Sequence, residues 1–246
     1  MDKGLYVAMT GAQATLRSQA AVANNLANKD TAGFKSERVS TDTFVIPGAG
    51  LPTRVDAVPT AAGIDDSSGP VLVTGNDLDV ALRDGVWLAV QARDGQEAYT
   101  RGGELRGTPD GVLTTAAGRP VLGDGGPITV PPNEKVTIGG DGTVTVRPLG
   151  KGPETMATVG RLRLVQATAH EQLVRGEDGL MRAKTPPERA TGNAVTSGAI
   201  EGSNVDTAGS LVQMIELSRQ FEMQVKVLRN GEEMARSSAS LLRLGG

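Results

Sequence analysis

The chain has 246 residues, 33 of them Gly and 13 Pro, with only six aromatic residues and a formal net charge of −3. The absence of Cys excludes disulfides and thiol nucleophiles, and a single His, His170, excludes a multi-histidine metal site. No excess of basic residues points to nucleic acid, and no apolar run approaches the ~20 residues of a membrane span.

The first predicted element is a helix over Leu5 to Ala27. Apolar or small residues recur there at spacings of three and four, at Leu5, Met9, Ala12, Leu16, Ala23 and Leu26. The helix ends in an asparagine-rich stretch, and Gly33 offers a left-handed turn out of it. Because Asp2 offsets Lys3 and polar residues dilute the apolar stretch, we expect no cleaved signal peptide here.

The centre of the chain has a period of two instead of 3.6, which predicts a β-rich domain over residues 70–183. Short strands are predicted over residues 78–82, 86–91, 142–146 and 160–165. Asp-Gly pairs, which favour turns with positive φ, separate them at 84–85, 94–95, 110–111, 124–125, 141–142 and 178–179. The Pro-, Gly-, Thr- and Ser-containing segments 36–69 and 184–202 show little periodicity and are interpreted as extended linkers.

The last predicted element is a long helix from Thr207 to about Leu242. We interpret Ser203 to Asp206 as its capping box. A stripe with alternating spacings of three and four follows it, and its members are Leu211, Met214, Ser218, Phe221, Val225, Leu228, Glu232, Ala235, Ala239 and Leu242. Burying this stripe would offset only part of the entropy lost on ordering the helix, so it needs partners. One possibility is that the helix packs on the N-terminal helix and on other chains. The alternatives are that the two terminal helices form a core within one chain, or that they pack on the β domain.

These elements predict an α+β fold. The N- and C-terminal helices pair as a coiled-coil-like layer, and an antiparallel, mostly-β domain is inserted between them. The predicted divisions are 1–35, the N-terminal helix and its turn; 36–69, a linker; 70–183, the β domain; 184–202, a linker; and 203–246, the C-terminal helix.

A search for catalytic, cofactor-binding and metal-binding patterns indicates none. The sequence contains no nucleophile elbow and no complete phosphate-binding glycine motif, and its acidic clusters do not have the spacing of a calcium loop. His170 is interpreted as a loop residue, and Trp87 as part of the β-domain core. We therefore expect a protein that is not an enzyme and binds no cofactor, no metal and no nucleic acid.

Three ordered motifs resemble bacterial flagellar rod and hook proteins. The first is Ala23 to Asn28 followed by Thr31 to Lys35, and the last is Glu201 to Asp206 with Met214-Ile215 and Arg219 to Glu222. The middle motif comprises residues 75–82, 85–90 and 99–101. The residues taken as the signature are Asn24, Asn25, Leu26, Asn28, Gly33, Ser203 and Asn204. Lys29 and Asp30 depart from the family pattern, in which smaller or less charged residues are expected at these two positions. The start of the chain and its length are most similar to the proximal-rod members, with the distal-rod members as the alternative.

The resemblance implies a structural subunit that polymerises into a hollow rod through the periplasm and transmits torque for motility. It implies as partners the chain's own copies, other proximal and distal rod proteins and the flagellar type III export machinery, with export that cleaves no signal peptide and no insertion into a membrane. On this hypothesis, ten residues form the helix contacts within and between subunits, and we call them the interface set. They are Leu5, Met9, Leu16, Leu26, Phe34, Met214, Phe221, Val225, Leu228 and Leu242. The alternative from another functional class is a soluble binding module, in which the β domain binds a ligand and the helices form a dimer.

Overall fold

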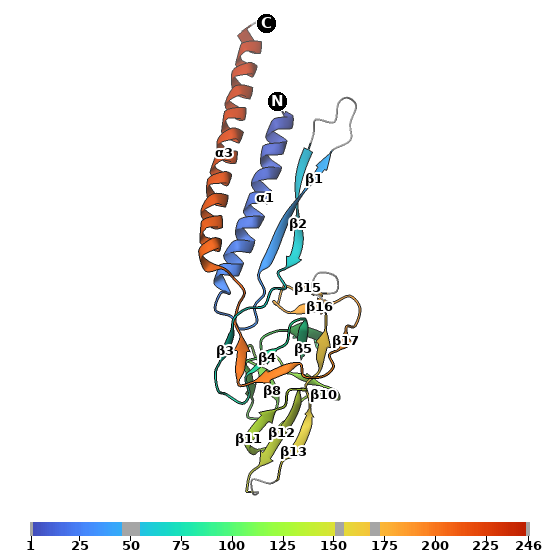
Figure 1. Ribbon diagram of the computed structural model, residues 1–246. Coiled ribbons are helices and arrows are strands. Elements are labelled where there is room, and N and C mark those ends of the chain that lie inside the picture. The colour runs from blue at the N-terminus through green and yellow to red at the C-terminus, as the bar shows by residue number, and fades with distance from the viewer. Residues whose placement is uncertain (1, 46–54, 151–154, 168–172, 245–246) are drawn as a thin grey trace. The chain divides into compact units, whose positions relative to one another are not determined.

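A computed structural model describes residues 2–45, 55–150, 155–167 and 173–244 (Figure 1). The chain divides into two compact units. Unit 1 contains residues 1–27, 37–62 and 206–246, and unit 2 contains residues 28–36 and 63–205. Two terminal helices and a large antiparallel β region confirm the predicted α+β class. His170 and the 46–54 part of the predicted linker lie outside the described residues.

Unit 1 contains α1 (Asp2–Ala27), α3 (Thr207–Leu244) and a two-stranded sheet of β1 (Glu37–Val45) and β2 (Val55–Ile64). The helices pack side by side and run in opposite directions (Figure 1). Leu5 at the start of α1 lies against Gly231, and Gly11 and Thr15, further along α1, lie against Gln224. Because α3 has 38 residues and α1 has 26, α1 is about 18 Å too short to cover its partner.

The sheet of β1 and β2 is a departure from the predicted linker over residues 36–69. Its strands run in opposite directions beside α1 (Figure 1). Asn25 joins the two kinds of element, because its Nδ2 donates to the Glu37 carbonyl (3.0 Å) and its Oδ1 accepts from the Glu37 amide (2.8 Å). The Thr, Ser, Asp and Pro residues of these strands favour an irregular segment locally, and the pairing of β1 with β2 overrides that preference.

The start of α3 corrects the predicted capping box. The helix begins at Thr207, and the residue that caps it is Asp206, whose Oδ1 accepts from the Ala208 amide at 3.1 Å. Ser203 instead accepts from the Val205 amide at 3.3 Å, within unit 2. The expected N-cap was therefore three residues too early, because Ser and Asp are both good cap residues and both precede the apolar stripe.

Unit 2 is built from short antiparallel strands. A six-stranded sheet has the order β15-β16-β6-β5-β14-β17, and a three-stranded sheet has the order β11-β12-β13. Four two-stranded sheets are β18-β4, β19-β3, β7-β8 and β10-β9. The bounds are β3 Val71–Val73, β4 Val80–Leu82, β5 Val86–Gln91, β6 Glu97–Thr100, β7 Leu105–Gly107, β8 Leu113–Thr115, β9 Leu122–Gly123, β10 Gly126–Pro127, β11 Asn133–Ile138, β12 Thr143–Pro148, β13 Ala157–Arg161, β14 Leu164–Gln166, β15 Leu173–Arg175, β16 Met181–Ala183, β17 Glu188–Arg189, β18 Val195–Ser197 and β19 Ala199–Glu201.

Strand β5 lies at the centre of unit 2 and is buried on both faces. Val86, Leu88 and Val90 belong to one apolar cluster, while Trp87 and Ala89 belong to the other. Trp87 is 3% exposed and its indole Nε1 donates to the Ala167 carbonyl. Its place in the core agrees with the interpretation from sequence.

Two predictions for unit 2 need correction. The segment 184–202 is not a linker, because it contains β17, β18 and β19, which pair with β14, β4 and β3. The strand predicted over 160–165 is divided between β13 and β14, which belong to different sheets. Strands of two or three residues are too short to show a period, and their partners lie far away in the sequence.

The Asp-Gly turns follow the prediction more closely. The glycine of five of the six pairs has a positive φ, at Gly85, Gly95, Gly111, Gly142 and Gly179. In the remaining pair the next residue, Gly126, takes that conformation instead, with φ 117°.

Candidate functional site

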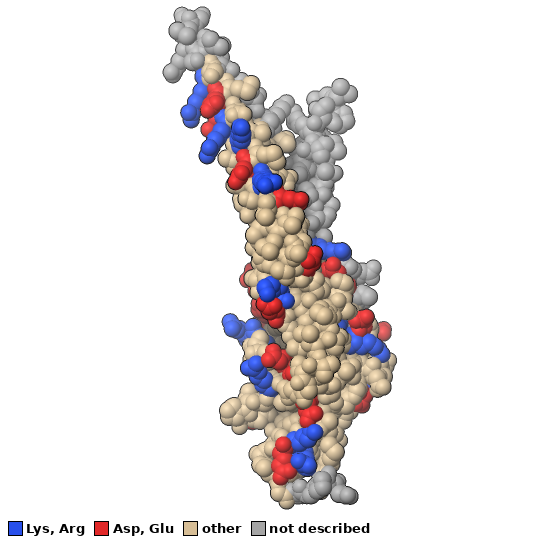
Figure 2. Space-filling view, turned by 60° about the vertical axis from the view of Figure 1, so that its left-hand side comes forward, with Lys and Arg blue, Asp and Glu red and all other residues tan. Residues whose placement is uncertain are grey.

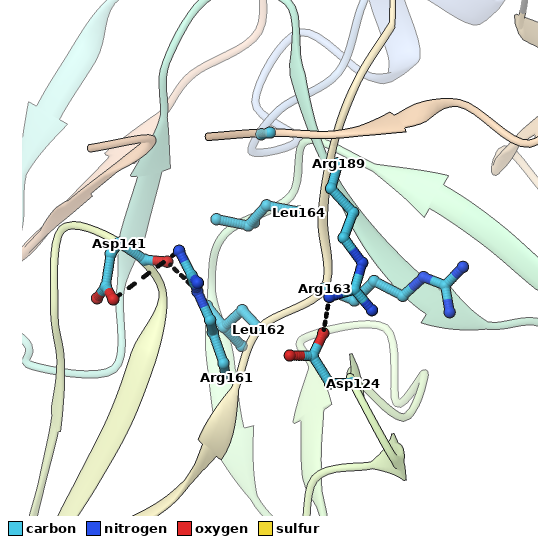
Figure 3. Close-up of a pocket in the computed structure, with 8 residues that line it drawn as sticks. Asp124, Asp141, Arg161, Leu162, Arg163, Leu164 and Arg189 are labelled. Atoms are coloured by element: carbon cyan, nitrogen blue, oxygen red, sulfur yellow. Dashed lines mark hydrogen bonds and ion pairs between the residues drawn. The ribbon is translucent and has the colours of Figure 1, made fainter. Parts of the chain in front are cut away.

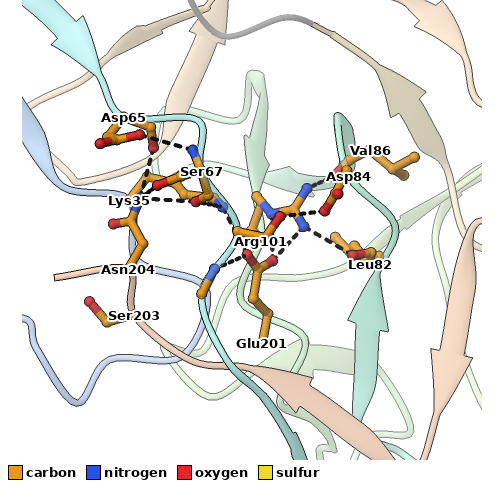
Figure 4. Close-up of polar contacts among 12 residues, drawn as sticks. Lys35, Asp65, Ser67, Leu82, Asp84, Val86, Arg101, Glu201, Ser203 and Asn204 are labelled. Carbon is orange, nitrogen blue, oxygen red and sulfur yellow. Dashed lines mark hydrogen bonds and ion pairs between the residues drawn. The ribbon is translucent and has the colours of Figure 1, made fainter. Parts of the chain in front are cut away.

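A polar cluster in unit 2 with a buried charged centre brings together residues from the three motifs of the resemblance. We call it the polar junction and define it by Lys35, Ser67, Arg101, Glu201 and Asn204 (Figure 4). The side chains of Lys35, Arg101 and Glu201 are each at least 97% buried. The sequence offered the three charges only as parts of separate motifs, so their meeting was not predicted.

Glu201 is the centre of the polar junction. Its Oε1 accepts from Lys35 Nζ at 2.8 Å and from the Gly69 amide at 3.0 Å. Its Oε2 lies 2.6 Å from Arg101 Nε and 2.5 Å from Nη2. Both oxygens of this buried carboxylate are therefore occupied by charged or backbone donors, as burial of a charge requires.

Arg101 uses the rest of its guanidinium on backbone carbonyls around β4 and β5. Nη2 donates to the Leu82 carbonyl at 2.9 Å, and Nη1 donates to those of Val86 at 2.8 Å and Arg83 at 3.2 Å. The guanidinium also lies 5.8 Å from the centre of the Trp87 ring. Glu201 is thereby fixed to the core of unit 2.

Asn204 and Lys35 connect backbone segments that are far apart in sequence. Asn204 Oδ1 accepts from the Ser36 amide at 2.7 Å, and its Nδ2 donates to the carbonyls of Asp65 (2.9 Å) and Ser67 (3.0 Å). Lys35 Nζ donates to the same Ser67 carbonyl at 2.7 Å. Segments around residues 35, 66 and 204 are thus joined at one place.

Gly33 allows the first of these segments to approach the others. Its φ is 68°, and its amide donates to the Glu201 carbonyl at 2.7 Å. A Cβ here would lie 2.2 Å from the Arg101 carbonyl carbon, so only glycine fits. Phe34, predicted at an interface, is half-buried in unit 2, where the Arg175 guanidinium lies 4.6 Å from its ring centre.

The remaining signature residues lie at the end of α1. Asn24 is exposed, Asn25 is buried, and Leu26 is half-buried. Asn28 accepts a hydrogen bond from the Thr31 hydroxyl at 3.2 Å in the turn that follows.

The second candidate feature is the surface of the helix pair in unit 1. Met214, Phe221, Val225 and Leu228 share one half-buried stripe of α3 with Gln224, which contacts α1. Leu5 is half-buried against Gly231 in the same contact. These members of the interface set therefore line the packing of α1 with α3, and the side chain of Leu242 lies outside the described residues.

A different set of apolar side chains remains uncovered on the helices. On α1, Met9 and Leu16 from the interface set are 44% and 46% exposed. Among the side chains that the structure describes on these helices, the exposed set is Val7, Met9, Leu16, Leu211, Val212, Ile215, Met223, Val227 and Met234. Acidic and basic side chains are interspersed along the C-terminal half of α3 (Figure 2). Six of the nine lie on α3 and three on α1, so the exposed apolar side chains are concentrated on the two terminal helices.

The cavities of unit 2 offer little for catalysis. Arg161, Arg163 and Arg189 surround one of about 30 Å³, which is the space of a single water molecule (Figure 3). Each arginine has an acidic neighbour, since Asp141, Glu97 and Asp124 lie 3.9, 3.1 and 3.0 Å from them, respectively.

A larger, open groove of about 510 Å³ has mostly Pro, Gly, Thr and aliphatic residues in its lining, together with Asp110. The described residues contain no group of three or more His, Cys, Asp or Glu placed to hold a metal ion. Among the described residues, no helix is both long enough and apolar enough to cross a bilayer.

Comparison with known proteins matches all three regions of the chain. Residues 5–35 match the model for flagella basal body rod protein, residues 84–146 that for the flagellar hook protein FlgE/F/G D1 domain, and residues 196–241 that for the flagellar basal body rod FlgEFG protein C-terminal. The flagellar basal-body rod protein FlgF of Escherichia coli is 40% identical over 99% of this chain and 100% of its own length. FlgF of Salmonella typhimurium is 41% identical over the same shares. FlgG of Buchnera aphidicola is less similar, at 30% over 98% of this chain and 100% of its own.

Proposed function

The chain belongs to the flagellar basal-body rod protein family, and we propose that it forms the proximal part of that rod through helix packing between copies. It is a structural subunit of the flagellar basal body, and the FlgF proteins of Escherichia coli and Salmonella typhimurium are more similar to it than the FlgG of Buchnera aphidicola is. The proximal position and the detailed packing are the proposed parts of this assignment.

The exposed apolar set on α1 and α3 is the observation that carries the packing proposal. Half-exposed side chains of this size gain about 1 kcal/mol each when a neighbour covers them. The surplus length of α3 adds a segment that α1 cannot cover. A helical polymer supplies neighbours to every copy along the whole helix, whereas a discrete dimer supplies only one.

The finer assignments follow from this role. We propose that the chain crosses the periplasm within the rod, is exported by the flagellar type III apparatus without cleavage, and contacts other rod proteins at the ends of its own layer. We also propose that it has no catalytic activity, which is supported by its membership of a family of structural rod proteins.

A matched pair of substitutions tests the packing proposal. Met223 on α3 and Met156 in unit 2 are 62% and 56% exposed, so Asp at either position costs the monomer little. We expect Met223→Asp to abolish incorporation into basal bodies and swimming, and Met156→Asp to preserve both. The assay is complementation of a strain that lacks its own copy, with equal protein amounts verified. Normal swimming with Met223→Asp would contradict the proposal.

A further inference from the structure

Three of the four crossings between the units lie next to the polar junction. The chain passes between unit 1 and unit 2 at residues 27–28, 36–37, 62–63 and 205–206. Within unit 2, Lys35 and Ser36 precede the second crossing, Asp65 and Ser67 follow the third, and Asn204 precedes the fourth. The hydrogen bonds of the polar junction therefore hold the segments at which the chain enters and leaves unit 2.

Charge compensation alone does not explain Lys35. Arg101 already supplies Glu201 with a positive partner at 2.5 Å, and that pair is neutral and bound to four backbone groups. Lys35 adds a second buried cation, 3% exposed, whose desolvation opposes folding. What its ammonium adds is a connection between the Ser67 carbonyl and Glu201.

We propose that Lys35 is a positioning residue for rod assembly. Its ammonium holds the connecting segments of unit 2 at fixed distances from one another, so that the helices of unit 1 are presented in the arrangement that the polymer accepts. This inference rests on the proposed packing of copies through their terminal helices. It predicts that Lys35 matters for assembly more than for the folding of unit 2.

Substitution of Lys35 by Met separates these two roles. Met retains the length of the apolar stem and leaves Arg101 and Glu201 as a neutral pair. Lys29→Met is the matched control, because Lys29 lies in the same turn segment but is exposed, and its ammonium pairs with the neighbouring Asp30 at 2.6 Å. Fluorescence of Trp87, the chain's single Trp, reports unfolding of unit 2 from within its core.

We expect Lys35→Met to keep the urea midpoint of unit 2 within about 0.5 M of wild type and to lower incorporation into basal bodies at least tenfold. Lys29→Met should match wild type in both measurements. Normal incorporation of Lys35→Met would overturn the inference. A fall in the stability of unit 2 that accounts for the whole loss of incorporation would also overturn the inference, if the second variant described below shows the same fall.

That second variant is Asn204→Ala, which removes the bonds to Ser36, Asp65 and Ser67 without changing a charge. Reduced incorporation of Asn204→Ala with unit 2 folded supports the inference. Normal incorporation of this variant overturns it, and so does unfolding of unit 2 in both Lys35→Met and Asn204→Ala. Wild-type protein that fails to restore swimming refutes the rod assignment itself. If wild type and Lys35→Met both restore swimming, the inference alone fails.

Discussion

Gly33→Ala tests whether the turn after α1 is fixed by contact with Arg101 as well as by its backbone conformation. The new Cβ would lie 2.2 Å from the Arg101 carbonyl carbon, 2.3 Å from its oxygen and 2.4 Å from the Gly102 nitrogen. These are backbone atoms, so rotation of a side chain cannot relieve the overlap. The matched control is Gly118→Ala, because Gly118 has a similar φ of 72° with no atom within 4 Å of the new Cβ.

The two substitutions share one cost and differ in another. Placing Ala in the left-handed region costs about 1–2 kcal/mol at either position. At Gly33, moving the backbone to remove the overlap adds about 1–3 kcal/mol. Weakening the bond from the Gly33 amide to the Glu201 carbonyl adds about 1 kcal/mol. We therefore expect a loss of about 1–2 kcal/mol for Gly118→Ala and about 3–6 kcal/mol for Gly33→Ala.

Urea unfolding followed by Trp87 fluorescence measures both variants in the full chain. With a slope of about 2 kcal/mol per M, the midpoint should fall by roughly 0.5–1 M for Gly118→Ala and 1.5–3 M for Gly33→Ala. Equal midpoints for the two variants would show that the approach to Arg101 carries no energy, and would refute this account of the turn.

Three further predictions concern titration and assembly. Burial raises the pKa of Tyr99 to about 12, so stability from the neutral phenol is present below about pH 10 and lost as the pH rises toward 12; in a Tyr6→Phe chain, a 295 nm absorbance midpoint near pH 10 would contradict this. The hydrogen bond from Arg182 lowers the pKa of Asp178, so its contribution is present above about pH 4 and lost as the pH falls through the lowered value; Asp178→Asn should lower the urea midpoint at pH 7, and this effect should shrink as the pH falls through the lowered pKa. Phe221→Asp should block rod completion and swimming while the unfolding midpoint of unit 2 stays at the wild-type value, and normal swimming would contradict its packing role.

Local sequence signals predicted the elements that local interactions determine. The end of α1 at Ala27, the start of α3 at Thr207 and the whole of β5 agree with the spacing of apolar residues and with the turn residues beside them. Asp-Gly pairs identified tight turns because the requirement for positive φ is a property of one or two residues.

Contacts between distant residues explain what the sequence did not predict. Strand β19 exists because it pairs with β3, more than a hundred residues earlier, and its three residues show no period of their own. Lys35 and Glu201 are separated by 166 positions, and each alone resembles an exposed charge in a loop. Only the fold shows that both are buried and that Arg101 lies between Glu201 and the core.

The apolar stripe of α3 illustrates a further limit of periodicity. Met214, Phe221, Val225 and Leu228 form its most regular pattern, and they lie on the half-buried face that packs with α1. An intrachain contact persists in the monomer and in the polymer, so its stripe can be mostly apolar, with Ser218 and Gln224 as its polar members.

A surface that is covered only after assembly must also keep the monomer soluble. The exposed set on the same helix is correspondingly interrupted, with Glu216 and Arg219 between Val212 and Met223. The predicted stripes therefore contain residues of both surfaces: most of the α3 stripe lies in the intrachain contact, whereas Leu211 on α3 and Met9 and Leu16 on α1 are exposed. The assembly surface that we propose consists of large apolar side chains that stay exposed once that contact has formed, and Met223 and Val227 are among them.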